Sequence, residues 1–135
     1  MINNEPLRIV AACSYYFALF LLICLMVFTI IIFQEYEIIK DMSNNNYELY
    51  CVSIGLITLT SIEIITWFLF FTNCAFLYMG LFIILSEFAI FAVLRQIDPK
   101  NENLTYCFFV TGIICVLYVI TLIWIIYATS TKKEN

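Results

Sequence analysis

The sequence contains no histidine, which removes the side chain most often used for acid–base catalysis near neutral pH. None of its six cysteines forms a Cys-x-x-Cys pair, and without histidine no mixed Cys/His set exists for zinc. The glycine-rich loop of phosphate-binding proteins and the HExxH and GxSxG motifs are also missing from the sequence. We therefore expect a protein that is not an enzyme, with no metal and no cofactor.

Loop-forming and charged residues are scarce as well. Three glycines, two prolines and 12% charged residues leave little material for loops or for a water-exposed surface. Instead, 64% of the residues are hydrophobic and the mean hydropathy is +1.02, which lies outside the range of globular proteins. The composition predicts an integral membrane protein whose partner is the lipid bilayer, with no nucleic-acid partner.

Four apolar runs are long enough to cross a bilayer, since a hydrocarbon core of roughly 30 Å requires about 20 residues of helix. They cover residues 7–33, 49–71, 74–94 and 104–127. Thr72 and Asn73 divide the middle two, because an unbroken helix would overshoot the bilayer and Asn favours turns. A three-span arrangement fits less well. We expect an all-α protein with four transmembrane helices in an antiparallel bundle, short loops and no separate soluble domain.

The even number of spans places both termini on one side of the membrane. Arg8 lies at the start of the first span whereas Glu35 and Glu37 follow it, which favours a cytosolic N-terminus. Lys132 and Lys133, in the C-terminal KKEN, resemble the dilysine retrieval signal of endoplasmic-reticulum membrane proteins, which is read from the cytosol. The alternative, ordinary positive charge beside the last span, gives the same orientation. We expect a multi-pass protein of the early secretory pathway with both termini cytosolic.

On this topology the outer loops are residues 34–48 and 95–103. Residues 44–46 are three consecutive asparagines, which we expect to form a solvated turn because Asn side chains bond the nearby backbone. Asn103 opens a glycosylation sequon in the second loop. It abuts the fourth span, so we expect it to remain unmodified.

Two cysteines form a candidate disulfide. Cys51 and Cys107 lie near the starts of the second and fourth spans, at similar depth on the outer side of the membrane. An oxidising compartment permits a bond there, provided that the two Cα atoms lie within about 7 Å of each other. The alternative is two free thiols.

Two carboxylic acids, Glu63 and Glu87, lie within an apolar stretch from residue 49 to residue 94 that contains no other charged side chain. Charge at bilayer depth is costly, so such acids mark a candidate functional site. Glu63 lies ten residues before Asn73 and Glu87 lies fourteen after it, about 15 and 21 Å along helices of 1.5 Å rise per residue. This difference of about one helical turn allows both acids to share one site.

Polar or small residues share the helical stripe of each acid, and such stripes usually face other helices rather than lipid. The stripe residues are Ser53, Thr60 and Thr66 with Glu63, and Asn73 and Gly80 with Glu87. Both acids are therefore expected to face inward, toward a common site lined by Thr60, Thr66, Ser86 and Gly80.

Three roles fit the two acids. They hold the bundle together as protonated groups, or they meet polar or basic residues of a partner's helices, or they load and unload a proton or cation. Because no Lys, Arg or His lies at their depth, at least one acid is expected to be protonated. No inverted repeat or broken helix indicates transport.

The favoured interpretation is an accessory or assembly factor that acts through intramembrane helix contacts with a membrane-protein partner or a second copy. The alternative is a small proton- or cation-handling transporter or channel subunit that uses Glu63 and Glu87.

The layout of four spans, short loops and cytosolic termini is similar to that of small tetraspan families such as the MARVEL group. The paired-cysteine ectodomain marks of tetraspanins and claudins are missing, and Trp67 and Trp124 match no tetraspan signature. A likeness of architecture alone implies no particular function.

Overall fold

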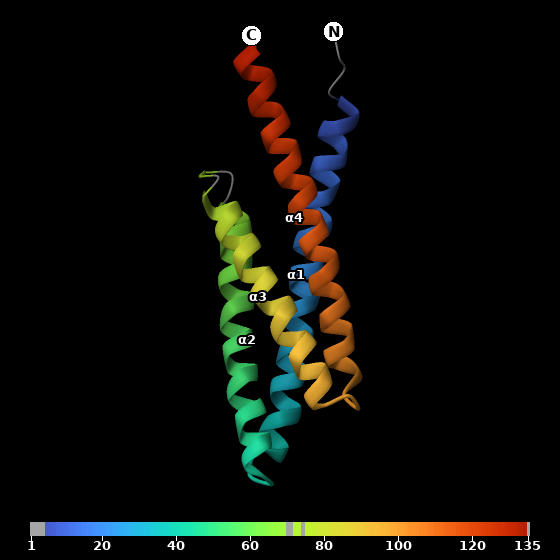
Figure 1. Ribbon diagram of the computed structural model, residues 1–135, viewed down its shortest axis with the longest axis vertical. Helices are drawn as coiled ribbons and strands as arrows, with labels where there is room; N and C mark the ends of the chain where they lie inside the picture. The colour runs from blue at the N-terminus through green and yellow to red at the C-terminus, as the bar shows by residue number, and fades with distance from the viewer. Residues whose placement is uncertain (1–4, 70–71, 74, 135) are drawn as a thin grey trace.

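The computed structural model describes residues 5–69, 72, 73 and 75–134, and these form four helices and no strand (Figure 1). The helices are α1 (Glu5–Ile39), α2 (Asn44–Leu69), α3 (Ala75–Ile97) and α4 (Glu102–Glu134). Each is long and apolar enough to cross a bilayer, so the predicted all-α four-span membrane bundle is confirmed. The α1–α2 and α3–α4 turns lie at one end, and α1 begins and α4 ends at the other (Figure 1).

The first and last helices, α1 and α4, are much longer than the hydrocarbon core is thick. At 1.5 Å per residue, the 35 residues of α1 and the 33 of α4 extend about 52 and 50 Å. The 26 residues of α2 and 23 of α3 extend about 39 and 35 Å. The first span was predicted to end at residue 33, but α1 continues to Ile39 because Gln and Glu are good helix formers outside the lipid.

The α1–α2 turn is confined to residues 40–43. The Ser43 hydroxyl accepts a hydrogen bond from the backbone N–H of Asn46 over 3.2 Å, so Ser43 is the N-cap of α2. The predicted turn at residues 44–46 is therefore wrong, since these asparagines form the first turn of α2. The chain turns before them, where Ser43 provides the cap.

Asparagine side chains cap the next two helices. Asn73 Oδ1 accepts from the backbone N–H of Ala75 over 3.0 Å, and Asn101 Oδ1 accepts from that of Asn103 over 3.1 Å. The predicted division between the second and third spans at Asn73 is confirmed, and the capping bond gives its physical reason.

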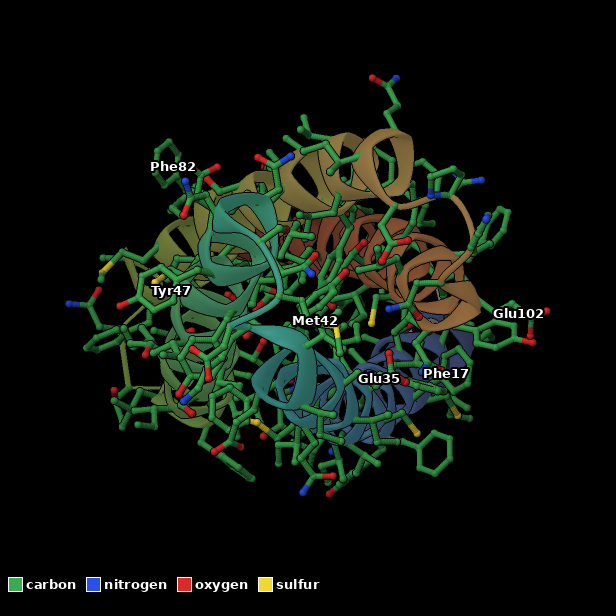
Figure 2. All side chains as sticks on the ribbon, turned by 90° about the horizontal axis from the view of Figure 1, so that it is seen from below. Phe17, Glu35, Met42, Tyr47, Phe82 and Glu102 are labelled. Carbon is green, nitrogen blue, oxygen red and sulfur yellow. The ribbon has the colours of Figure 1, made fainter. Side chains whose placement is uncertain are left out.

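Buried residues recur three or four positions apart along every helix, the period of bundles with left-handed knobs-into-holes packing. On α2 they include Leu49, Ser53, Leu56, Thr60, Glu63 and Trp67, and on α3 Leu77, Gly80, Ile84, Glu87, Phe91 and Leu94. On α1 they include Ser14, Ala18, Leu25, Thr29, Ile32 and Tyr36, and on α4 Leu104, Cys107, Thr111, Ile114, Tyr118 and Thr121. The outward positions carry large apolar side chains such as Phe82, which is 73% exposed and projects away from the bundle (Figure 2).

Each helix packs against two neighbours, α1 and α3 each lying between α2 and α4. Across the diagonal, no Cα atom in the described part of α2 comes within 8 Å of one in α4. The predicted disulfide is therefore wrong: Cys51 on α2 is an exposed free thiol and Cys107 on α4 a buried one. Their Cα atoms are farther apart than a disulfide can span.

Candidate intramembrane carboxylic acid site

Glu63 and Glu87 both face the interior of the bundle. Glu63 lies on α2 and Glu87 on α3, and neither has any exposed surface. Each occupies a position of the buried 3–4 repeat of its helix, Glu63 between Thr60 and Trp67 and Glu87 between Ile84 and Phe91. The bundle thus encloses two acids on adjacent helices.

Glu63 is bonded across the diagonal of the bundle. The hydroxyl of Tyr118, on α4, donates a hydrogen bond to Glu63 Oε1. Gly80 on α3 makes room for this hydroxyl, since a Cβ atom at Gly80 would lie 2.6 Å from the Tyr118 oxygen. Three helices therefore meet at one contact: α2 provides the acid, α4 provides the phenol, and α3 provides the glycine that leaves space for the phenol.

Trp67 encloses the other side of Tyr118. The two rings meet edge to face, with centroids 4.6 Å apart and planes at 65°. Trp67 also stacks on Tyr15 of α1 at 5.2 Å, and its Nε1–H donates to the Tyr15 backbone carbonyl over 3.2 Å. These contacts connect α1 to the site and fix the ring that holds the Glu63 carboxyl.

Glu87 is bonded to Thr60 of α2. The Thr60 hydroxyl oxygen lies 3.2 Å from Glu87 Oε1 and 2.8 Å from the backbone carbonyl of Leu56. Thr60 is one helical turn from Glu63, so the two carboxyls belong to one connected cluster. We call Thr60, Glu63, Gly80, Glu87 and Tyr118 the acid cluster.

The second oxygen of each acid is buried without a partner. Among the described residues, neither Glu63 Oε2 nor Glu87 Oε2 accepts a hydrogen bond or meets a cation. An ionised carboxylate in such surroundings is costly by several kilocalories per mole, because buried charges require pairing. The site therefore favours the uncharged form of both acids.

The remaining predicted site residues are placed differently. Thr66 is buried next to Glu63, but its hydroxyl donates to the Glu63 backbone carbonyl over 2.8 Å and not to the carboxyl. Ser86 is partly exposed and donates to the Phe82 carbonyl of its own helix over 3.0 Å, so its predicted place in the site is wrong. The side chains of Lys132 and Lys133 lie outside the described part of the structure.

The sequence predictions missed Tyr118 and Trp67. A signal for Tyr118 was present, because Thr111 lies seven residues before it and Thr121 three after it, the same spacing that marked the interior stripe of α2. Trp67 lies four residues after Glu63 and thus on the same face.

A second polar cluster joins α1 to the α3–α4 turn. The side-chain amides of Asn101 and Asn103 donate to the two oxygens of Glu35 over 2.9 and 2.7 Å. The Tyr36 hydroxyl donates to Asp98 Oδ2 over 3.2 Å. In the folded chain the Asn103 side-chain amide is thus hydrogen-bonded to Glu35.

No protein family, curated protein or solved structure matches the chain. Among the described residues, no group of three or more thiol, imidazole or carboxylate side chains is placed to hold a metal ion.

Proposed function

We propose that the protein is a non-enzymatic accessory or assembly factor, in which the two acids are neutral groups that hold its own helices together. The placement of the acids supports this proposal. Each carboxyl is fully buried and hydrogen-bonded to a side chain of a neighbouring helix of the same chain. Acids buried in this way are not accessible to a partner. A partner therefore contacts the apolar outer faces of the bundle.

The hydrogen count at Thr60 supports a protonated Glu87. A threonine hydroxyl has one hydrogen, yet its oxygen lies at bonding distance from both the Leu56 carbonyl and Glu87 Oε1. The carbonyl is only an acceptor, so it takes the threonine hydrogen. Thr60 makes two full hydrogen bonds, rather than sharing its one hydrogen between two acceptors, when Glu87 provides the second hydrogen, as a protonated carboxylic acid does.

Purification of the protein from its own membranes tests the accessory role. The protein carries an N-terminal tag, is extracted in mild detergent, and its complexes are identified by mass spectrometry. We expect a stoichiometric polypeptide or a second copy to accompany the wild type and Glu87→Gln, because Gln preserves the hydrogen bond. A monodisperse single chain with no companion would contradict the proposal.

Transport of a proton or cation is the second candidate, favoured by the unpaired oxygens Glu63 Oε2 and Glu87 Oε2. Purified protein in sealed vesicles with a pH-sensitive dye inside distinguishes the two functions. We expect no proton or cation flux above that of empty vesicles. Flux that disappears in Glu63→Gln or Glu87→Gln would support transport and contradict the structural role of the acids.

Residence in the early secretory pathway is supported by the dilysine pattern at Lys132 and Lys133. A double variant, Lys132→Ser with Lys133→Ser, is expected to move forward to the Golgi or cell surface, as seen by fluorescence microscopy with an N-terminal tag. If the double variant remains with the wild type, the lysines are not read as a signal.

A further inference from the structure

The seam between α2 and α3 is open at the end where the α1–α2 and α3–α4 turns lie. There, α2 is held to α1 by Phe33 and Tyr50, whose rings stack with centroids 5.3 Å apart. α3 is held to α4 by Phe88 and Phe108, which stack at 4.6 Å. Beyond the Thr60–Glu87 bond, α2 thus packs against α1 and α3 packs against α4, and a gap is left between α2 and α3.

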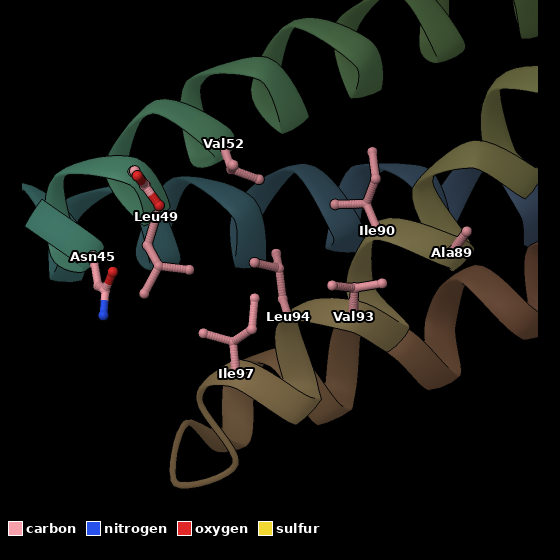
Figure 3. A pocket seen from close by; sticks show the side chains of 9 residues that line it. Asn45, Leu49, Val52, Ala89, Ile90, Val93, Leu94 and Ile97 are labelled. Atoms are coloured by element: carbon pink, nitrogen blue, oxygen red, sulfur yellow. The ribbon is translucent and has the colours of Figure 1, made fainter.

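This gap is a groove of about 680 Å³, within the range of roughly 300–1,000 Å³ that ligand pockets occupy. Leu49 and Val52 of α2 face Ile90, Val93, Leu94 and Ile97 of α3 across it (Figure 3). The lining extends from Asn45 to Val52 on α2 and from Ala89 to Ile97 on α3, which gives the groove a length of about 10–12 Å along the helices. The groove opens sideways, toward the surroundings of the bundle.

Polarity changes along the groove in one direction. Its deeper part is entirely aliphatic, whereas its mouth, at the first turns of α2, is lined by Asn45 and Glu48. The Glu48 side chain is exposed, and its carboxylate forms no hydrogen bond or ion pair with any described residue. Lys40 and Arg95 contact aromatic rings instead: Lys40 lies 4.9 Å above the Tyr50 ring and Arg95 4.7 Å above that of Phe108.

We propose that the groove binds an amphiphile with a long aliphatic chain and a cationic amine head. The chain lies between α2 and α3, and the ammonium pairs with Glu48 at the mouth. The aliphatic walls match a hydrocarbon chain, and the exposed Glu48 carboxylate, which has no ion-pair partner among the described residues, attracts a positive charge at the end that reaches the membrane surface. This site goes beyond the accessory role and does not depend on it.

A partner's transmembrane helix fits the groove less well. Helices in membranes associate through small residues that let backbones approach, or through polar groups that bond across the interface. The lining has one small residue, Ala89, and the rest of its deeper part is branched aliphatic. Such walls accommodate a thin flexible chain more readily than a helix.

Photoactivatable lipids test the proposal in the full-length protein, reconstituted in phosphatidylcholine nanodiscs. The probes are octadecylamine and stearic acid, each with a diazirine at the same carbon, and labelled peptides are mapped by mass spectrometry. We expect the amine to label residues 45–52 and 89–97 more than the acid does, and unlabelled octadecylamine to compete. Equal labelling of all lipid-facing peptides would overturn the site.

Two pairs of variants separate the groove from the general surface. Val93→Trp fills the groove and is expected to abolish its labelling, whereas Val116→Trp, at a position of similar exposure on α4 (59% against 55%), leaves labelling unchanged. Glu48→Gln disturbs no packing and is expected to lower amine labelling about two- to fivefold, while Glu37→Gln has no effect.

Amine and acid labelling that are equal, and unaffected by Glu48→Gln, would overturn the proposed head group. Groove residues that crosslink to another membrane protein from native membranes, and stay unlabelled by the amine, would show a partner helix there instead and overturn the proposal.

Discussion

A single added methyl group at Gly80 meets the ring that holds Glu63. The new Cβ would lie 2.6 Å from the Tyr118 hydroxyl oxygen and 3.0 Å from its Cε1, so Tyr118 must shift away from the acid. Gly80→Ala is therefore expected to destabilise the protein by about 1–3 kcal/mol, despite the better helix propensity of alanine. The measurement is thermal unfolding in detergent. Gly55→Ala is the matched control, because a Cβ added at Gly55 would have no atom within 4 Å beyond the backbone of its own helix. Equal effects of the two variants would contradict the close contact between position 80 and Tyr118.

The charge state of the acid cluster is open to direct observation by infrared spectroscopy. Both acids lack a cation and each has an unpaired oxygen, so we expect a protonated carboxyl band at neutral pH. Glu63→Gln and Glu87→Gln are each expected to remove part of this band and to cost at most about 1 kcal/mol of stability. The leucine variants, which cannot hydrogen-bond, are expected to be less stable than the glutamine variants. A wild-type spectrum without the band would refute the neutral acids.

Polar residues revealed the interior of this protein because nearly every other position is apolar. Glu63, Thr60, Gly80 and Glu87 were predicted to face inward from their spacing, and all four are buried. Tyr118 was not predicted as the partner of Glu63, since it lies 55 residues away in the sequence. Spacing gives the face of a helix but not which residue of another helix stands opposite.

At the scale of the helices, the start of α2 depends on a single capping bond to Ser43, which a substitution can remove. Ser43→Ala removes the acceptor for the Asn46 N–H and is expected to cost about 1 kcal/mol, with faster hydrogen exchange at the first amides of α2. Ser61→Ala is the control, because the Ser61 hydroxyl bonds the Ile57 carbonyl within the same helix. Equal exchange in the two variants would show that Ser43 is not the cap.

The opening of the α2–α3 seam was not foreseen from the sequence. It results from ring contacts between distant segments, Phe88 with Phe108 and Phe33 with Tyr50, which draw the two helices toward different neighbours. Aromatic residues are frequent in this chain, so their positions alone do not indicate which rings meet. The number of helices follows from hydropathy, whereas their pairing depends on packing.

At the scale of the whole molecule, the four helices agree with the four predicted spans. The four spans were predictable because a bilayer admits only helices here and sets their minimum length. The expected orientation depends on a weaker signal, Arg8 in the first turns of α1 against Glu35 and Glu37 near its end. The turn of residues 40–43 and the α3–α4 turn lie together at the end of the bundle away from the start of α1 (Figure 1).

Labelling of introduced cysteines in sealed microsomes, whose cytosolic face is outward, tests this orientation. Asp41→Cys and Lys100→Cys lie in the two turns at one end, and Thr72→Cys follows the end of α2 at the other; all three native residues are exposed. With both termini cytosolic, a membrane-impermeant maleimide is expected to label Thr72→Cys directly and the other two only after detergent is added. The wild type measures labelling of the native thiols. Direct labelling of Asp41→Cys or Lys100→Cys would mean that the chain is inverted or inserts in both directions, because a four-span bundle places these two turns on the same side.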